Sequence, residues 1–393
     1  MTKPLVLRHF DKDSFLSNYW QKAPCLIKAG LSEIPEFICA DELAGLSLEE
    51  EVESRIICSP TDNSAEHGKT QDGWKLQHGP FDENTFAKLP ERNWTLLVQT
   101  IDFWIPETQQ LVDLFNFIPR WRFDDLMVSY ATQGGGVGPH YDNYDVFLVQ
   151  GAGERRWQVG AKGKIPEEQK YIDGLKHLKA FKPEIDVIMQ PGDILYIPPE
   201  TAHWGVSVGE SLGYSVGFRA PQSRDLFAMI ANYLEETESN EFFEDVYRKK
   251  TNNSSCLEPE LIKWAQDKIN NLSKNQEVIK QILSNHLSQP KLESCARPPE
   301  LPFPKFLKET LLPDQKLTLN PGSYFNWVMS EGRLIFSIDG ETFSCPATFK
   351  EPIERLFSGE SLEVTDIEAV KEKFAFSDLL ASLVNKGYLI VTA

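Results

Sequence analysis

Residues 23–220 contain many short apolar runs that glycine, proline and polar residues separate. The runs at 145–150 and 155–159 have the length and the β-branched and aromatic residues of strands. A Gly- and Glu-containing turn, 151–154, joins them, so we predict a hairpin here and a second one around the Pro-Gly-Asp turn at 191–193. The pattern predicts a mainly β domain, and paired hairpins suit a double-stranded β-helix, or jelly roll.

The same region holds other predictable elements. Apolar residues at helical spacing predict helices at 11–22 and 108–118. The runs 204–208 and 212–218 flank a Gly-Glu turn and are predicted to form a third hairpin that closes the barrel. Residues 161–185 are charged and rich in turn residues, so we interpret them as an insertion or lid.

The apolar spacing becomes helical after residue 223. One stripe includes Leu226, Ile230 and Tyr233, and a second includes Leu261 and Ile269. Each stripe predicts a helix with one apolar face, which would pack on the β domain.

Five prolines between residues 288 and 304 mark a linker before the last part of the chain. A helix is predicted at 377–385 and a strand at 388–391, and helices with a terminal hairpin are typical of winged-helix folds. We therefore predict a β domain at 1–220, a helical segment at 221–297 and a small α+β, winged-helix-like domain at 298–393.

Acidic residues outnumber basic residues along the chain. The formal net charge of the 393 residues is −18, which fits a basic partner better than the phosphates of nucleic acid. Residues 301–393 hold 9 Lys and Arg against 13 Asp and Glu, so DNA binding by the last domain is disfavoured. Negative charge also aids solubility, and charge alone does not separate these two interpretations.

The cysteines and the apolar runs indicate the compartment. The six cysteines form no Cys-x-x-Cys motif and are predicted to be thiols in a reducing environment. We find no secretory signal and no apolar run of about 20 residues that could span a membrane. The expected location is the cytoplasm.

A His-x-Asp motif, His140 and Asp142, follows the glycine-rich segment 134–138. Residues two apart in a strand point to the same face, so the imidazole and the carboxylate can converge on one ion. His203, which follows the predicted second hairpin, can supply another ligand. Two histidines and one carboxylate on one face of a metal, with other positions open, are typical of non-haem Fe(II) oxygenases.

These motifs carry a specific resemblance. Gly138-Pro-His-Tyr-Asp142, Phe147-Leu-Val-Gln150, Gly153-Glu-Arg-Arg-Trp157 and the stretch from Pro191 to His203 resemble the JmjC group of 2-oxoglutarate oxygenases. Within this group the chain resembles the bacterial ribosomal oxygenases. The resemblance implies a cupin-like catalytic domain, Fe(II) held by His140, Asp142 and His203, 2-oxoglutarate as co-substrate and O2. It also implies 3-hydroxylation of an arginine in large-subunit ribosomal protein sixteen, and a homodimer formed through the helical segment.

The resemblance also indicates residues for the co-substrate. Related enzymes bind 2-oxoglutarate with a hydroxyl on the strand before the His-x-Asp motif, where this chain has Ser129. They place a Lys or Arg for the distal carboxylate on the strand of Arg155 and Arg156, and an Arg fork can form two parallel hydrogen bonds to a carboxylate. We choose Arg155 over Arg156 because Trp157 shares its face.

Tyr144 and Asp145 lie beside the metal motif, and we expect them to receive a substrate guanidinium by stacking and ion pairing. Three alternatives stay open. A JmjC oxygenase of the same chemistry would act on histidyl or methyl-lysyl residues of another protein. A cupin metal-binding protein would not turn over 2-oxoglutarate, and a winged-helix regulator would bind DNA.

Overall fold

The computed structural model forms two compact units, residues 1–220 and 221–393. The separate domains predicted at 221–297 and 298–393 stay a prediction. The structure describes residues 5–33, 36–60, 73–166, 168–170, 176–178, 180–237, 241–250, 255, 257–292, 296–300, 302–304, 311–312 and 314–392.

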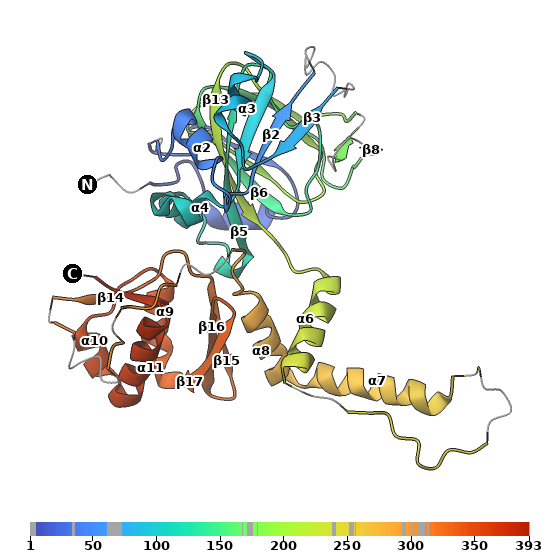
Figure 1. Cartoon of the computed structure of the whole chain (residues 1–393), viewed down its shortest axis with the longest axis vertical. Coiled ribbons are helices and arrows are strands. Elements are labelled where there is room, and N and C mark those ends of the chain that lie inside the picture. The colour runs from blue at the N-terminus through green and yellow to red at the C-terminus, as the bar shows by residue number, and fades with distance from the viewer. Residues whose placement is uncertain are drawn as a thin grey trace. The chain divides into compact units, whose positions relative to one another are not determined.

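Antiparallel strands make up most of the first unit (Figure 1). They are β1 (Cys25–Ile27), β2 (Ser54–Cys58), β3 (Lys75–His78), β4 (Trp94–Val98), β5 (Phe123–Ala131), β6 (Asp145–Ala152), β7 (Arg155–Val159), β8 (Glu168–Lys170), β9 (Lys176–Leu178), β10 (Ile185–Met189), β11 (Ile194–Ile197), β12 (His203–Ser207) and β13 (Ser211–Phe218).

The strands form two facing layers and one small ribbon. The larger sheet has eight strands in the order β1-β11-β6-β13-β5-β4-β2-β3, and the smaller has three in the order β10-β7-β12. β8 and β9, from the predicted insertion, pair with each other. The mainly β, jelly-roll prediction is confirmed.

The three predicted hairpins are wrong. β6 and β7 lie in different sheets, and so do β10 and β11, and β12 and β13. β6 already pairs with β11 on one edge and with β13 on the other, so it has no free edge for β7. The tight turns are corners at which the chain passes from one sheet to the other, and each strand pairs with partners that are distant in sequence.

Short helices flank the sheets, namely α1 (Lys12–Asn18), α2 (Ala40–Leu46), α3 (Glu83–Ala87), α4 (Ile101–Trp104) and α5 (Gln109–Asp113). α1 begins after Asp11, whose carboxylate accepts a hydrogen bond from the Ser14 N–H at 2.6 Å. The predicted helix at 108–118 is too long, because beyond Asp113 the backbone forms only three-residue turns. Phe115 and Ile118 remain buried all the same.

Aromatic side chains join the large sheet to α1 and to the segment that follows α5. Phe147 of β6 stacks on Phe115 with ring centroids 4.2 Å apart. Phe15 of α1 packs edge-on against Tyr196 of β11 at 4.9 Å. This packing fills the outer face of the sheet and leaves its inner face to the cavity described below.

The second unit begins with the helices α6 (Ser223–Glu236), α7 (Pro259–Lys274) and α8 (Gln276–His286). α6 and α7 expose large apolar side chains, with Phe227 66% and Ile269 63% exposed. α8 packs on the sheet that follows it, where the Ser284 hydroxyl bonds to Asn326 Oδ1 at 2.8 Å.

The C-terminal part has its own buried core. Its elements are β14 (Lys316–Leu319), β15 (Phe325–Ser330), β16 (Arg333–Ile338), β17 (Glu341–Pro346), α9 (Lys350–Phe357), α10 (Val364–Ala369), α11 (Lys373–Asn385) and β18 (Leu389–Thr392). β15, β16 and β17 form one sheet, and β18 pairs with β14 at the start of this region and not with a neighbouring strand. Within the described part of the chain, no helix has the length and apolar character needed to cross a membrane.

Candidate metal centre

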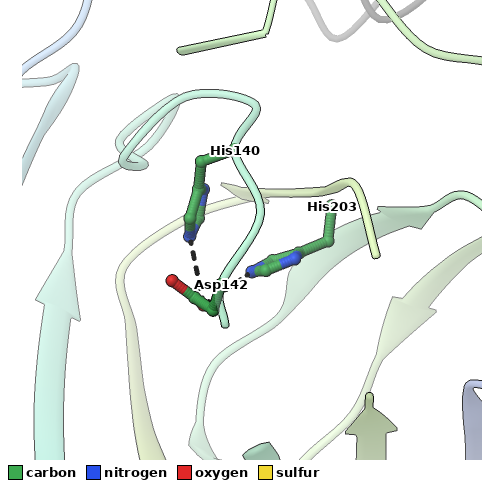
Figure 2. A group of neighbouring side chains, drawn as sticks. All are labelled: His140, Asp142 and His203. Carbon is green, nitrogen blue, oxygen red and sulfur yellow. Dashed lines mark ion pairs between the residues drawn. The ribbon is translucent and has the colours of Figure 1, made fainter. Parts of the chain in front are cut away.

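The side chains of His140, Asp142 and His203 point toward one another (Figure 2). One ligand atom from each lies within 4.8 Å of the others. Asp142 Oδ2 is 3.8 Å from His140 Nε2 and 3.5 Å from His203 Nε2. The three donors therefore face one point, as the sequence predicted, although His140 and Asp142 lie in a loop and not in a regular strand.

Main-chain hydrogen bonds hold the two ligand segments together. The N–H of His140 donates to the carbonyl of His203 at 3.0 Å, and the N–H of His203 donates to the carbonyl of His140 at 2.8 Å. The N–H of Glu200 donates to the carbonyl of Asp142 at 2.8 Å. The ligand geometry is thus built into the fold, because the segment around Asp142 is bonded to the segment that ends at His203.

Both imidazoles are oriented in the same way. Nδ1 of His140 lies 2.9 Å from the carbonyl oxygen of Gly138, and Nδ1 of His203 lies 2.9 Å from that of Thr201. A carbonyl only accepts, so each Nδ1 carries the hydrogen and each Nε2 keeps a lone pair for a metal. Burial lowers the pKa of His203 to about 4, which keeps this ring neutral at physiological pH. Two imidazoles that are oriented through Nδ1 and one carboxylate fit a divalent transition metal.

Arg155 supplies a buried positive charge on the cavity wall. It is 8% exposed, and its guanidinium donates to the hydroxyl of Ser129 at 2.9 Å and to that of Ser211 at 3.2 and 2.9 Å. Burial lowers its pKa to about 10, so it remains charged at neutral pH. Among the described residues no carboxylate pairs with Arg155. A buried guanidinium of this kind fits an anionic ligand such as the distal carboxylate of 2-oxoglutarate.

Arg156 points the other way. Its guanidinium binds both carboxylate oxygens of Asp186 at 2.7 and 2.6 Å on the outer side of the small sheet. The structure therefore has Arg155 pointing inward, as we predicted from the sequence.

A cavity of about 380 Å³ connects these groups. The metal triad, Ser129 and Arg155 line it together with apolar side chains that include Val146, Leu148 and Trp157. Tyr144, Asp124 and Asp125 also line it. Burial raises the pKa of Tyr144 well above its ordinary value, and the nearby charges of Asp142, Asp125 and Asp124 raise it further.

Asp145 does not line this cavity, so its predicted contact with substrate is wrong. It is fully buried, and its carboxylate accepts hydrogen bonds from Tyr196 at 2.5 Å, Arg122 at 2.9 Å and Gln21 at 3.0 Å. The strand alternation that turns Tyr144 and Val146 toward the cavity turns Asp145 toward the core. Asp145 forms its ion pair with the guanidinium of Arg122 in the same chain.

Several residues of the site were missed by the sequence reasoning. Ser211 begins β13 opposite Ala131 of β5 and accepts hydrogen bonds from Arg155, and strand alternation on β13 would have shown which way it points. Asp125 follows the same rule, since Asp125, Met127 and Ser129 share one face of β5. His177 comes from the predicted insertion, and no local pattern indicated its position in the cavity wall.

Comparison with known proteins places this architecture in a family. The JmjC domain matches residues 110–226 of the chain. The chain is 36% identical over 376 residues to the Escherichia coli ribosomal protein uL16 3-hydroxylase, which covers 95% of this chain and 96% of that protein. A probable ribosomal oxygenase of Haemophilus influenzae is 42% identical over 229 residues, 57% of this chain and 53% of that protein.

Solved structures agree with the sequence match. The structure of E. coli YcfD superposes with a TM-score of 0.84 at 33% identity and covers 99% of this chain and 100% of that one. A structure of the ribosomal oxygenase YcfD in complex with cobalt and 2-oxoglutarate has a TM-score of 0.80, with the same identity and coverage.

The jelly roll, the two histidines with one carboxylate, and the buried arginine define a JmjC-domain oxygenase that depends on Fe(II) and 2-oxoglutarate. Within that class, the near full-length match shows that the chain belongs to the ribosomal oxygenase family of protein hydroxylases.

Proposed function

We propose that this enzyme hydroxylates C3 of an arginyl residue in ribosomal protein uL16. The observation that carries the proposal is one cavity lined by the metal triad, by the buried guanidinium of Arg155, which no carboxylate among the described residues neutralises, and by an acidic wall. The name of the E. coli relative supplies the protein and the position of oxidation.

His140, Asp142 and His203 would hold Fe(II), and Ser129 and Arg155 would bind the distal carboxylate of 2-oxoglutarate. When bound, the metal and the co-substrate supply the activation of O2 that protein side chains lack. The chain orients the ligands through its main-chain bonds and limits water with the apolar wall around Trp157. Arg155 remains protonated at neutral pH, so it can bind the dianion without a proton transfer.

The acidic wall supports a cationic target. Asp124 and Asp125 line the cavity together with Tyr144, whose ring can stack on a guanidinium. Asp124 also pairs with Arg219 at 2.6 Å, which neutralises part of this wall. We assign Tyr144 to the substrate, as the sequence predicted, and we assign Asp125 in place of Asp145 because Asp125 lines the cavity and Asp145 does not. The net charge of −18 fits a basic ribosomal protein as the partner.

The rest of the proposal concerns assembly and location. A homodimer would cover the apolar side chains that α6 and α7 expose, which include Phe227 and Ile269. The C-terminal domain is proposed to be winged-helix-like and, because it is acidic, to contact protein and not nucleic acid. A cytoplasmic location would give the enzyme access to ribosomal proteins.

The test is incubation of the Fe(II)-loaded enzyme with 2-oxoglutarate, O2 and purified ribosomal proteins, followed by mass spectrometry. We expect one added oxygen on an arginine of uL16, with stoichiometric succinate. His140→Ala and Arg155→Ala should abolish it, and Arg156→Ala should not. Oxygen on a histidine or loss of a lysine methyl group would replace the substrate assignment, and no succinate with any protein would refute the oxygenase proposal.

A further inference from the structure

The strand β9, which pairs with β8, lies against the loop that carries His140. His177 of β9 is 1% exposed, and its Nε2 is 2.6 Å from the carbonyl oxygen of Val137. Because a carbonyl only accepts, His177 Nε2 carries a hydrogen and donates it. The next residue, Leu178, donates its N–H to the carbonyl of Pro139 at 2.8 Å.

These two bonds fix the carbonyls on either side of Gly138. The carbonyl of Gly138 itself accepts from His140 Nδ1 at 2.9 Å. Peptide groups are planar, so the bonds to the carbonyls of Val137 and Pro139 restrict the rotation of the peptide between them. β9 thereby determines where the Gly138 carbonyl points, and this carbonyl in turn determines which way the imidazole of His140 faces.

Packing leaves the His177 ring little freedom. On one side it meets Gly138, where an added Cβ would lie 2.6 Å from Nε2 and 2.7 Å from Cε1. On another side the ring of Trp74 contacts it edge-on, with centroids 4.7 Å apart. Gly138 has a φ of +81°, a conformation that favours glycine. The close approach of the His177 ring also requires a residue without a Cβ at this position.

Leu178 connects β9 to the segment that carries His203. It is fully buried in a cluster with Ala202 and Trp204, which flank His203, and with Tyr141, which lies between His140 and Asp142. One short strand therefore contacts the neighbours of all three proposed ligands, although it comes from a charged insertion outside the two main sheets.

We propose that His177 is a positioning residue for the metal centre, and that the insertion which carries it holds the His140 loop in its metal-binding conformation. The inference rests on the proposed metal assignment. His177 does not contact the metal. It acts through the carbonyls of Val137 and Gly138 on the ring of His140, in the way that outer hydrogen bonds orient metal-bound histidines.

The test is titration of the whole apo-protein with Co(II), followed by the d–d absorption bands of the bound ion. His177→Phe keeps an aromatic ring but removes the donor, and we expect the affinity for Co(II) to fall about tenfold or more, with altered bands. His177→Gln keeps an amide donor at a similar reach and should restore the affinity to within about threefold of the parent. His78→Phe, the same change at an exposed position of β3, is the matched control and should bind Co(II) as the parent does.

Each outcome decides the question. Equal affinity and equal bands in His177→Phe would overturn the proposal, and so would a His177→Gln variant that is as weak as His177→Phe while its circular dichroism is native. His177→Phe could fail to fold while His177→Gln folds. In that case, a His177→Gln variant with the thermal midpoint and the Co(II) spectrum of the parent supports the donor role. A His177→Gln variant with the midpoint of the parent but weak Co(II) binding overturns it. Failure of the metal assignment itself is distinguishable, because His140→Ala would then bind Co(II) as well as the parent.

Discussion

His140 and His203 are bonded to each other through both of their main-chain amides, at 3.0 and 2.8 Å, while their ring centroids are 4.2 Å apart. The two ligands therefore approach each other because their backbones pair, and a metal does not have to gather them. Such preorganisation lowers the entropy that metal binding would otherwise cost.

Metal should stabilise the folded protein without being required for folding. With Mn(II) or Co(II) at 100 times its Kd, mass action adds about 2.7 kcal/mol, which corresponds to a rise in melting temperature of roughly 5–10 °C for a unit of this size. We expect the rise in a thermal-shift experiment on the parent protein and its loss in Asp142→Ala. An apo-protein without cooperative unfolding, or an equal rise in Asp142→Ala, would contradict this account.

Ser211 should control the affinity for 2-oxoglutarate. It accepts hydrogen bonds from Nε and Nη2 of Arg155 and so orients the guanidinium. A hydrogen bond to a charged group contributes about 1.5 kcal/mol or more, so Ser211→Ala should raise the KM for 2-oxoglutarate about tenfold and leave kcat nearly unchanged. Ser211→Thr retains the hydroxyl and serves as the control. An unchanged KM in Ser211→Ala would show that Ser129 alone suffices.

Asp145 should matter for stability and not for substrate. Its carboxylate is the buried partner of Arg122, so Asp145→Asn leaves a buried cation unpaired and should lower the free energy of unfolding by about 3–5 kcal/mol. Urea denaturation measures this loss, and the KM for the uL16 peptide should not change in the folded variant. Tyr144→Ala should do the reverse, with a raised peptide KM and a smaller change in stability. A raised KM in Asp145→Asn would restore our sequence-based prediction.

Arg156 and Asp186 should affect stability in a pH-dependent way. Hydrogen bonds from Arg156 hold the pKa of Asp186 below its ordinary range. The stabilisation is therefore complete above the ordinary carboxyl pKa of about 3.9 and is lost as the pH falls through the lowered value in the folded protein. The pair is exposed, so Arg156→Ala should cost no more than about 1 kcal/mol at pH 7. In urea denaturation this difference should shrink as the pH falls through the lowered pKa of Asp186, and a difference that grew with acid would contradict the assignment.

The helices α6 and α7 should form the dimer contact. Phe227 and Ile269 are large, apolar and more than half exposed in the single chain. Phe227→Asp combined with Ile269→Glu should convert the dimer to a monomer in light scattering after size exclusion. Phe374→Glu changes an exposed phenylalanine of α11 and should leave the dimer intact. A parent protein that is already monomeric would remove the homodimer from the proposal.

The sequence predicted the residues of the metal centre better than the path of the chain around it. His140, Asp142 and His203 follow from ligand type and spacing, and Arg155 was separated from Arg156 by the alternation of strand side chains. The hairpins were wrong, because a turn between two apolar runs has the same local pattern whether the strands pair or pass into different sheets. Only the long-range pairing of β6 with β11 and β13 distinguishes the two cases.

The sequence reasoning also assigned Asp145 wrongly and missed His177, because proximity in sequence differs from proximity in the folded chain. Asp145 is close to the metal motif in sequence, but its neighbours Tyr144 and Val146 line the cavity, and three distant residues bond its carboxylate. His177 is distant from the motif in sequence and lies in a charged segment, but its ring packs on Gly138. Contacts of this kind depend on tertiary packing that no local pattern contains.

The place of β13 in the large sheet has a consequence for synthesis. This strand is the last of its unit along the chain, but it lies between β6 and β5 and pairs with both. A growing polypeptide cannot complete the large sheet before this strand has left the exit tunnel. Because Ser211 of β13 orients Arg155, we expect a nascent fragment that lacks β13 to bind 2-oxoglutarate weakly and to remain inactive until the first unit has fully emerged.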